Sequence, residues 1–364
     1  MIINYETAWR SEVLAALGKY LPDMIICDES QRLKSPSSKQ SKAMQALGSR
    51  SSYNLILSGT PVMNSPLDFW AQYRFLGPSI FDPSYFAFKS RHAFMGGFEN
   101  RVVIGYRDLD VLVKKAHSVA SRVTKAQALD LPETTDKVVP FRLEPKAWRL
   151  YTKLNTEMIA ELGGLGKVTA PHIITKMLRL SQLTGGFITS DEGESIAVST
   201  AKLMALKDEL EDILDSGRKV VIFARFRAEI TAIHALAVQE AGADAVRMIW
   251  GDTRMADRGQ HVKDFQENPA VKVFIAQIAT AGLGITLTAA STAIFYSCDY
   301  SYANHEQAKA RIHRIGQRNA CTYIYLVAEG TVDESVLSTL KSKKSMADLV
   351  VDNWRTLLKE RSKP

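Results

Sequence analysis

"KVVIFA" (residues 219–224) decides the fold, because its five consecutive apolar residues, rich in β-branched side chains, have the length of one strand. A stretch with helical spacing of apolar residues follows at 228–241 and stops at Gly242. A second apolar run, "VKVFIA", comes at 271–276. Near-continuous apolar runs are typical of strands that helices cover on both faces. The order strand, helix, strand therefore predicts a parallel α/β sheet.

The same pattern extends in both directions from this stretch. Further strands are predicted at four places: 24–27 "MIIC", 53–57 "YNLIL", 292–298 "TAIFYSC" and 321–327 "CTYIYLV". Another helix is predicted at 254–267, where Asn268–Pro269 ends it. Residues 84–200 show little strand pattern, so we expect helical insertions there. The predicted fold class is α/β, with two parallel-sheet lobes and helical insertions between them.

Composition narrows the class of protein. The chain has 364 residues, 46% hydrophobic and 23% charged, as in an ordinary globular protein. Its three cysteines are scattered, which argues against a disulfide framework or a zinc cluster and favours a reducing cytoplasm. No apolar run is long enough for a membrane span, so no membrane partner is expected. The net charge of +7 suits a polyanionic partner, although a solvated basic tail would give the same charge.

Chemically rich stretches follow three of the predicted strands. They are "DESQ" (28–31), "SGTPVMN" (58–64) and "QIATAGLGITLTAA" (277–290). In open parallel sheets, ligands bind at the carboxyl ends of the strands, which is where these stretches lie. Each of them alone is weak evidence. The acid pair could be a cap or a surface pair, the second stretch a simple turn, and the third a helix start with glycines placed for packing.

A fourth stretch, "QAKARIHRIGQ" (307–317), carries two arginines. Gln307, Arg311 and Arg314 stand at i, i+4 and i+7, which predicts one stripe of a helix. The residues expected on the inward face are Ala308, Ile312 and Ile315. Two guanidinium groups aimed the same way repel each other unless an anion lies between them, and phosphate fits their fixed fork of donors. An exposed basic helix face is the alternative.

Together, in this order and spacing, the four stretches resemble the Swi/Snf family of superfamily-two helicase-like ATPases. "IICDESQRLK", "LILSGTPVMNSPLDFWAQYRFLGPSIF", "MLRLSQLTGG", "KVVIFARFR", "WGDTRMADRGQHVKDF", "IAQIATAGLGITLTAASTAIF" and "QAKARIHRIGQ" match the family blocks in sequence order. The resemblance covers nearly the whole chain and is closest to the compact phage and bacterial members. It implies two RecA-like lobes, hydrolysis of ATP with Mg²⁺ in the cleft between the lobes, and translocation on double-stranded DNA through backbone contacts.

The resemblance also implies a division of the chain. Residues 1–130 would form an incomplete first RecA-like lobe, the helicase ATP-binding domain, and 131–200 a helical insertion or linker. Residues 201–331 would form the second lobe, the helicase C-terminal domain, and 332–364 a basic helical tail. The place of action would be the cytoplasm of a bacterial or phage-infected cell.

Catalytic roles follow residue by residue from the resemblance. Asp28 would hold Mg²⁺ through water, and Glu29 would polarise the attacking water. Arg311 and Arg314 would be arginine fingers that stabilise charge on the transferring phosphoryl group. Ala310 stands where Asp is common in the family, which puts in doubt how firmly Arg311 is held.

Binding and coupling roles follow in the same way. Ser58 and Thr60 would couple the nucleotide state to the strength of DNA binding. Gln31 stands where many relatives have His, so this coupling could differ in detail. The nucleotide-binding residues of the second lobe would be Gly282, Gly284 and Gln317.

A phosphate loop of the GxxxxGK[ST] type is missing from the expected place, since only 27 residues precede Asp28. "GGLGKVT" (163–169) looks similar, but Val168 stands where Ser or Thr is needed, Leu162 where the first Gly is needed, and no strand leads in. We therefore expect a fragment of a longer reading frame, half of a split enzyme, or a degenerate copy. An upstream segment or partner chain would carry the loop. Two functions stay open: an ATP-dependent translocase, and a nucleic-acid-binding module that does not hydrolyse ATP.

Overall fold

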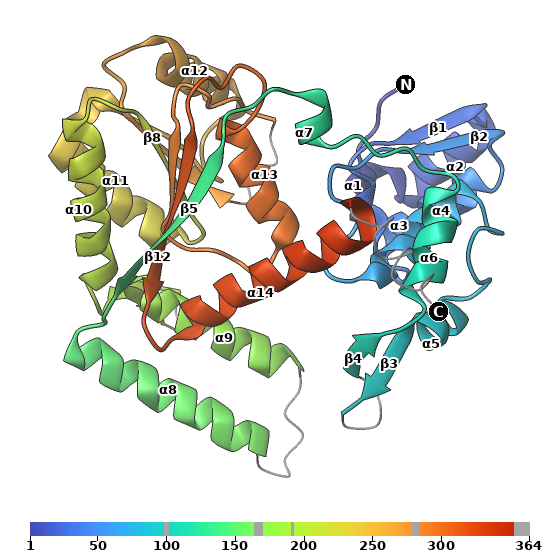
Figure 1. The fold of residues 1–364 in the computed structure, drawn as a ribbon, viewed down its shortest axis with the longest axis horizontal. Helices are drawn as coiled ribbons and strands as arrows, with labels where there is room; N and C mark the ends of the chain where they lie inside the picture. Colours follow the sequence, from blue (N-terminus) through green and yellow to red (C-terminus); the bar gives the residue numbers. More distant parts are fainter. Residues whose placement is uncertain (98–101, 164–169, 191–192, 279–283, 353–364) are drawn as a thin grey trace, which may run out of the picture. The chain divides into compact units, whose positions relative to one another are not determined.

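The computed structural model describes residues 1–97, 102–163, 170–190, 193–278 and 284–352 (Figure 1). The chain divides into two compact units. The first unit holds Met1–Thr124 and the chain from Lys341 onward, and the second unit holds Lys125–Leu340. Helix α14 (Val332–Ala347) begins in the second unit and ends in the first.

A six-stranded sheet forms the centre of the second unit, in the order β5-β12-β11-β8-β10-β9. All of its neighbouring strands pair in parallel. Its strands are β5 (Thr134–Phe141), β8 (Val220–Ala224), β9 (Val246–Ile249), β10 (Val273–Gln277), β11 (Thr292–Phe295) and β12 (Cys321–Ala328). The α/β fold class with a parallel sheet is thus confirmed.

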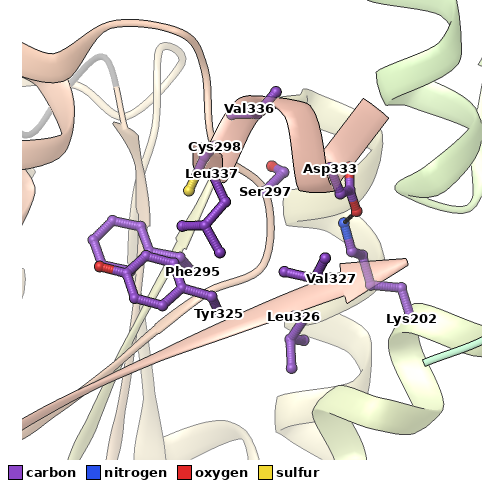
Figure 2. Close-up of a pocket in the computed structure, with 10 residues that line it drawn as sticks. All are labelled: Lys202, Phe295, Ser297, Cys298, Tyr325, Leu326, Val327, Asp333, Val336 and Leu337. Atoms are coloured by element: carbon purple, nitrogen blue, oxygen red, sulfur yellow. Dashed lines mark hydrogen bonds and ion pairs between the residues drawn. The ribbon is translucent and has the colours of Figure 1, made fainter. Parts of the chain in front are cut away.

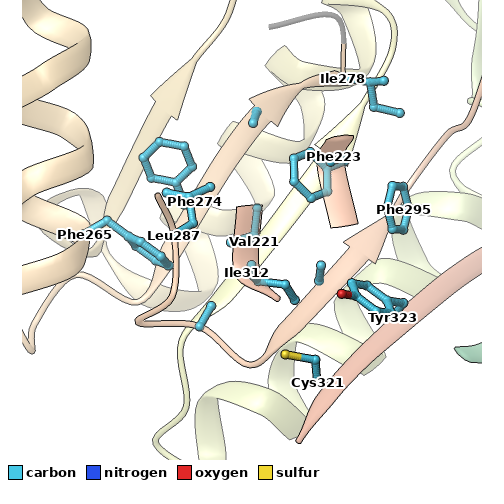
Figure 3. Packing of buried hydrophobic residues seen from close by; sticks show 14 of the residues in the cluster. Val221, Phe223, Phe265, Phe274, Ile278, Leu287, Phe295, Ile312, Cys321 and Tyr323 are labelled. Atoms are coloured by element: carbon cyan, nitrogen blue, oxygen red, sulfur yellow. The ribbon is translucent and has the colours of Figure 1, made fainter. Parts of the chain in front are cut away.

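Helices cover both faces of this sheet because its central strands are apolar on both sides. Alternate residues such as Val221 and Phe274 pack with Phe265 and Ile312, which come from α12 (Met255–Glu267) and α13 (Tyr302–Ile312) (Figure 3). The residues between them, such as Ile222, pack on the opposite face, against α10 (Ala201–Asp215) and α11 (Arg227–Ala241). The strand β8 is fully buried, as the opening stretch predicts.

The edge strands β5 and β9 were not predicted from the sequence. "TTDKVVPF" in β5 begins with polar residues and contains Pro140, and most of its residues are exposed. An edge strand pairs on one side only, so it tolerates Pro and polar side chains and loses the apolar pattern. The expectation of little strand between 84 and 200 is therefore wrong. The strands in this range are β3 (Ala93–Gly96), β4 (Val102–Tyr106), β5, β6 (Phe187–Thr189) and β7 (Ser195–Ala197).

Helices are nevertheless frequent in that range, as expected. They are α5 (Tyr85–His92), α6 (Leu109–His117), α7 (Lys125–Ala128), α8 (Pro145–Gly163) and α9 (Ala170–Thr184). The predicted tail helix is present as α14, followed by a π-helical turn at Asp348–Asp352. The loop-like "GKVT" of residues 166–169 and the tail beyond 352 lie outside the described residues.

The first unit contains a much smaller sheet. Strands β1 (Met24–Cys27) and β2 (Tyr53–Ile56) pair in parallel as a two-stranded sheet, and β3 and β4 form a separate antiparallel pair. Its remaining helices are α1 (Tyr5–Ala8), α2 (Ser11–Tyr20), α3 (Lys39–Gly48) and α4 (Phe69–Leu76). One apolar cluster joins α4, α5 and α6, with Phe88 and Leu112 fully buried.

Apolar residues of β1 and β2 remain exposed. Met24, Ile26 and Tyr53 are 49%, 54% and 68% exposed, although their runs resemble strands covered on both faces. The expectation of two-sided cover is wrong for these two strands, because the first unit supplies too few neighbouring strands and helices.

None of the helices in the described part of the chain is long and apolar enough to cross a membrane.

Candidate functional site

The acid pair of the first unit lies directly after β1. Glu29 adopts a left-handed backbone conformation with φ 49° and ψ 49°. Such a conformation costs a residue with a side chain about 1 kcal/mol or more and is frequent at active sites. Asp28 stabilises it, since its Oδ1 accepts the Glu29 N–H at 2.9 Å. The Tyr5 hydroxyl donates to the Asp28 carbonyl at 2.6 Å, so both residues have a fixed backbone.

A chain of hydrogen bonds joins Glu29 to the turn after β2. The Thr60 N–H donates to Ser58 Oγ at 3.1 Å, and Ser58 Oγ donates to Gln31 Oε1 at 2.6 Å. Gln31 Nε2 in turn donates to Glu29 Oε2. Because Gln31 is only 3% exposed, its amide is held in one orientation. Of the coupling residues predicted from sequence, Gln31 contacts the predicted catalytic carboxylate directly, and Ser58 and Thr60 connect to it through Gln31.

A second set of hydrogen bonds joins the same two stretches through Gln72. The Ser30 hydroxyl donates to Gln72 Oε1 at 2.9 Å, and Gln72 Nε2 donates to the carbonyls of Pro61 and Asp68 at 2.8 Å. Ser30 and Gln72 are fully buried. The stretches "DESQ" and "SGTPVMN" therefore form one connected polar layer at the carboxyl ends of β1 and β2.

Beside β1 the first unit has a hollow of about 980 Å³, large enough for a small-molecule ligand or for a further piece of chain. Its wall includes Ile26 and Met44, and Asp28, Glu29 and Arg32 lie along it. No cluster of three or more His, Cys, Asp or Glu side chains was found among the described residues. Mg²⁺ fits such a sparse site, because it keeps several waters and binds one or two carboxylates plus phosphate oxygens. Asp28 is the carboxylate that would hold it here.

The arginine pair of the second unit lies at the end of α13. The helix ends at Ile312, so the prediction that Arg314 continues the helical stripe is wrong. The two side chains still converge, since Nη1 of Arg311 and Nη1 of Arg314 each donate to the Ile285 carbonyl at 3.4 Å. Gly316, with φ +98°, makes the turn that follows, in a conformation that favours glycine.

The inward face of this segment is only partly as predicted. Ala308 and Ile312 are fully buried, but Ile315 is 72% exposed, because it lies in the turn beyond the helix. The expectation that Ile315 packs inward is therefore wrong.

The three nucleotide-binding candidates of the second unit have different surroundings. Gln317 is buried, and its amide nitrogen donates to the carbonyls of Ala290 at 2.8 Å and Ile312 at 3.1 Å. Its Oε1 accepts from two backbone N–H groups, so the side chain ties the end of α13 to the chain before β11. Gly284 has φ +73° and open space where a Cβ would lie. Gly282 lies outside the described residues.

A small cavity in the second unit is not a nucleotide site. It lies beside the buried ion pair of Lys202 Nζ with Asp333 Oδ2, at 2.7 Å, with Phe295 and Tyr325 at its other end (Figure 2). Its volume is about 20 Å³, which is room for roughly one water. This ion pair links α10 to α14 and is structural.

Sequence reasoning missed several groups that hold these sites. Tyr5 and Asp136 lie outside the quoted family blocks. Gln72, Ile285 and Lys309 lie inside these blocks, but the motifs assign them no role. Ile285 acts through its backbone carbonyl, which no side-chain pattern reveals. Asp136 lies in the edge strand β5, which was itself not predicted, and only that strand would have indicated its position.

The parallel α/β sheet and the order of the motifs are typical of the helicase-like α/β class. Two family comparisons agree: an SNF2-related domain matches residues 1–186, and a helicase conserved C-terminal domain matches residues 201–316. The chain therefore belongs to the SNF2-related family of helicase-like ATPases, as the resemblance implied.

Curated relatives come from several organisms. The DNA repair and recombination protein RDH54 of Saccharomyces cerevisiae (strain JAY291) is 26% identical over 100% of this chain and 41% of its own length. The Arabidopsis thaliana protein CHROMATIN REMODELING 4 is 26% identical over 91% of this chain and 15% of its own. The chain thus spans less than half of the length of these relatives.

Among solved structures, the Sulfolobus solfataricus SWI2/SNF2 ATPase core in complex with dsDNA is 26% identical. The match covers 97% of this chain and 74% of that chain, with a TM-score of 0.49.

Proposed function

We propose that this chain is the motor part of an ATP-dependent translocase on double-stranded DNA. The observation that carries the proposal is the hydrogen-bond chain from Thr60 through Ser58 and Gln31 to Glu29. A carboxylate held in this way has a fixed orientation for the water that attacks the γ-phosphate. Movement of the turn after β2 would shift Glu29 through the same bonds, which is how DNA contact could control hydrolysis.

In this proposal the candidate residues have the catalytic roles that the resemblance implies. Asp28 binds Mg²⁺ through water, and Glu29 polarises the attacking water. Arg311 and Arg314 neutralise charge on the transferring phosphoryl group, as a guanidinium pair that shares one carbonyl acceptor is suited to do. Gly282, Gly284 and Gln317 keep the nucleotide-binding roles that the resemblance implies, and the buried Gln317 side chain would act by holding the end of α13.

The β- and γ-phosphates need backbone N–H donors and a lysine. We propose that an upstream segment or a partner chain supplies them and packs into the hollow beside β1. The exposed apolar residues of β1 and β2 and the adjacent acid pair support this place.

Double-stranded DNA is the proposed nucleic acid along which the protein translocates. The net charge of +7 suits a phosphate backbone, and the similar curated protein RDH54 is named a DNA repair and recombination protein. The cytoplasm of a bacterial or phage-infected cell is the proposed place of action.

The test is ATP hydrolysis by the chain, purified both alone and with the segment encoded upstream, with and without duplex DNA. DNA-stimulated hydrolysis is expected for the completed protein. Glu29→Gln should abolish it, while Glu12→Gln on the exposed surface of α2 should not. Full activity of Glu29→Gln would refute the catalytic assignment.

The second candidate is a nucleic-acid-binding module that does not hydrolyse ATP. The open hollow favours it, because the described part of the first unit contains no phosphate-binding loop beside β1. Duplex binding would then be independent of nucleotide and would weaken steeply with salt, since Lys and Arg contacts release counterions. DNA affinity that changes with ATP would exclude this candidate.

A further inference from the structure

The chain that enters the sheet at β5 contacts the segment that carries the arginine pair. Residues 125–133 lead from the boundary of the second unit into β5. Strand β5 pairs with β12 in a register that places Asp136 beside Tyr323. Three contacts join β5 and the residues before it to α13 and to His313, which follows the helix.

The first contact is an ion pair. Lys309 Nζ lies 2.8 Å from Asp136 Oδ1, and the Lys309 side chain is only 13% exposed. The ammonium group also lies over the Tyr323 ring, 4.1 Å from its centroid, while the Tyr323 hydroxyl donates to the Lys309 carbonyl at 3.2 Å. A partly desolvated pair with a cation–π contact is stronger than an exposed ion pair. Lys309 stands two residues before Arg311.

The other two contacts hold His313, which stands between the arginines. Its Nε2 donates to the Pro132 carbonyl at 2.9 Å, and its own carbonyl accepts from Lys125 Nζ at 3.4 Å. His313 is the first residue beyond α13, where the helix no longer orients the chain. Arg314, the next residue, is thus attached to a residue whose ring and carbonyl are both held, and its own carbonyl accepts from the Gln317 N–H at 3.0 Å.

The Lys125 ammonium group also lies near the charged side chains of the segment that carries the arginine pair. Partial burial lowers the pKa of the Lys125 amine, and Arg314, Arg311 and Lys309 lower it further, while Glu306 raises it. Lys125 thus lies in the electrostatic field of both arginines.

We propose that Asp136, Pro132 and Lys125 are positioning groups that fix the Arg311–Arg314 pair. Their effect on ATP turnover rests on the proposed function, but the positioning itself does not. Ala310 has no polar group, so the Lys309–Asp136 pair provides the polar attachment from the position directly before it.

Two measurements test the proposal with matched variants. Asp136→Asn removes the ion pair to Lys309. Lys137→Met removes the ion pair of the next residue on the same strand, Lys137 Nζ with Glu209 Oε1 at 2.7 Å, which joins β5 to α10. Amide hydrogen exchange should rise in residues 305–317 of Asp136→Asn and stay unchanged there in Lys137→Met.

The charge-reversed double variant Asp136→Lys with Lys309→Asp should restore slow exchange. His313→Gln keeps an N–H donor for the Pro132 carbonyl and should exchange like the wild type, whereas His313→Leu should exchange faster. Equal exchange in Asp136→Asn and Lys137→Met would overturn the proposal, whether or not the protein hydrolyses ATP.

In the completed ATPase, Asp136→Asn should lower kcat about tenfold, because a displaced transition-state group loses much of its effect, with little change in the KM for ATP. The double variant should recover the rate. A KM effect alone, or no rescue, would contradict a positioning role. If no variant and no wild type hydrolyses ATP, the proposed function fails while the exchange result still decides the positioning.

Discussion

Strands β8 and β1 look alike in sequence and end in different environments. "VVIFA" of β8 is fully buried between two layers of helices, while "MIIC" of β1 has Met24 and Ile26 about half exposed. The two strands differ in how many strands lie beside them in the sheet. Strand β8 lies in the middle of six strands, and β1 pairs only with β2.

An apolar run thus predicts that a strand forms but not that the same unit covers it. Burial of the sheet in the second unit contributes to its stability. The small sheet of the first unit instead leaves apolar side chains exposed to solvent. Experiments that compare the two sheets should therefore give unequal effects.

The largest difference is expected from truncating one apolar side chain in each sheet. Phe274→Ala removes a fully buried ring and should cost about 3–5 kcal/mol of unfolding free energy. Leu55→Ala in β2 removes a side chain that is 39% exposed and should cost clearly less, below about 2 kcal/mol. Denaturant unfolding of both variants measures this, and equal losses would contradict the comparison.

A pH effect of intermediate size is expected in the second unit. Burial raises the pKa of Glu229 from 4.5 to about 6, while Lys202 and the Ser297 hydroxyl, which donates at 2.5 Å, oppose it. The folded protein therefore holds the proton more tightly than the unfolded chain, and this stability is present below pH 4.5 and lost as the pH rises through 6. The shift corresponds to about 2 kcal/mol.

Melting temperatures of the wild type and Glu229→Gln between pH 4 and 7 test this. The wild type should lose stability relative to the variant as the pH rises. Parallel curves would show that Glu229 does not titrate in this way.

An effect of similar size is expected in the polar layer of the first unit. Ser58→Ala leaves the buried Gln31 Oε1 without its donor and should cost about 1–3 kcal/mol. Ser49→Ala, which loses a solvent-exposed bond to the Ala46 carbonyl, is the matched control and should change little. If both variants unfold at the same denaturant concentration, Gln31 is not held in the way described.

The sequence predicted what depends on local pattern, and it missed what depends on neighbours. The strands β1, β2, β8, β10, β11 and β12 and the helices α11 and α12 follow from apolar spacing, with ends shifted by a few residues. The edge strand β5 could not be predicted, since its pairing with β12 compensates for a polar sequence. The end of α13 before Arg314 depends on the turn at Gly316, which helical spacing does not reveal.

In the candidate site, too, local motifs predicted some residues, and others could be located only from the folded structure. Motifs located Glu29, Gln31 and Ser58, because their type and spacing are repeated across a family. The contacts that hold the arginine segment come from Asp136 and Pro132, more than 170 residues earlier in the chain. Only the folded sheet brings such distant residues together.

The most direct test of the central claim is a double-mutant cycle in DNA-stimulated ATP hydrolysis by the completed protein. If Glu29 and Arg314 act on one phosphoanhydride, Glu29→Gln and Arg314→Ala should each lower kcat by about a thousandfold or more, and the double variant should be little slower than either. Independent, multiplying effects, or full activity in either single variant, would contradict the account.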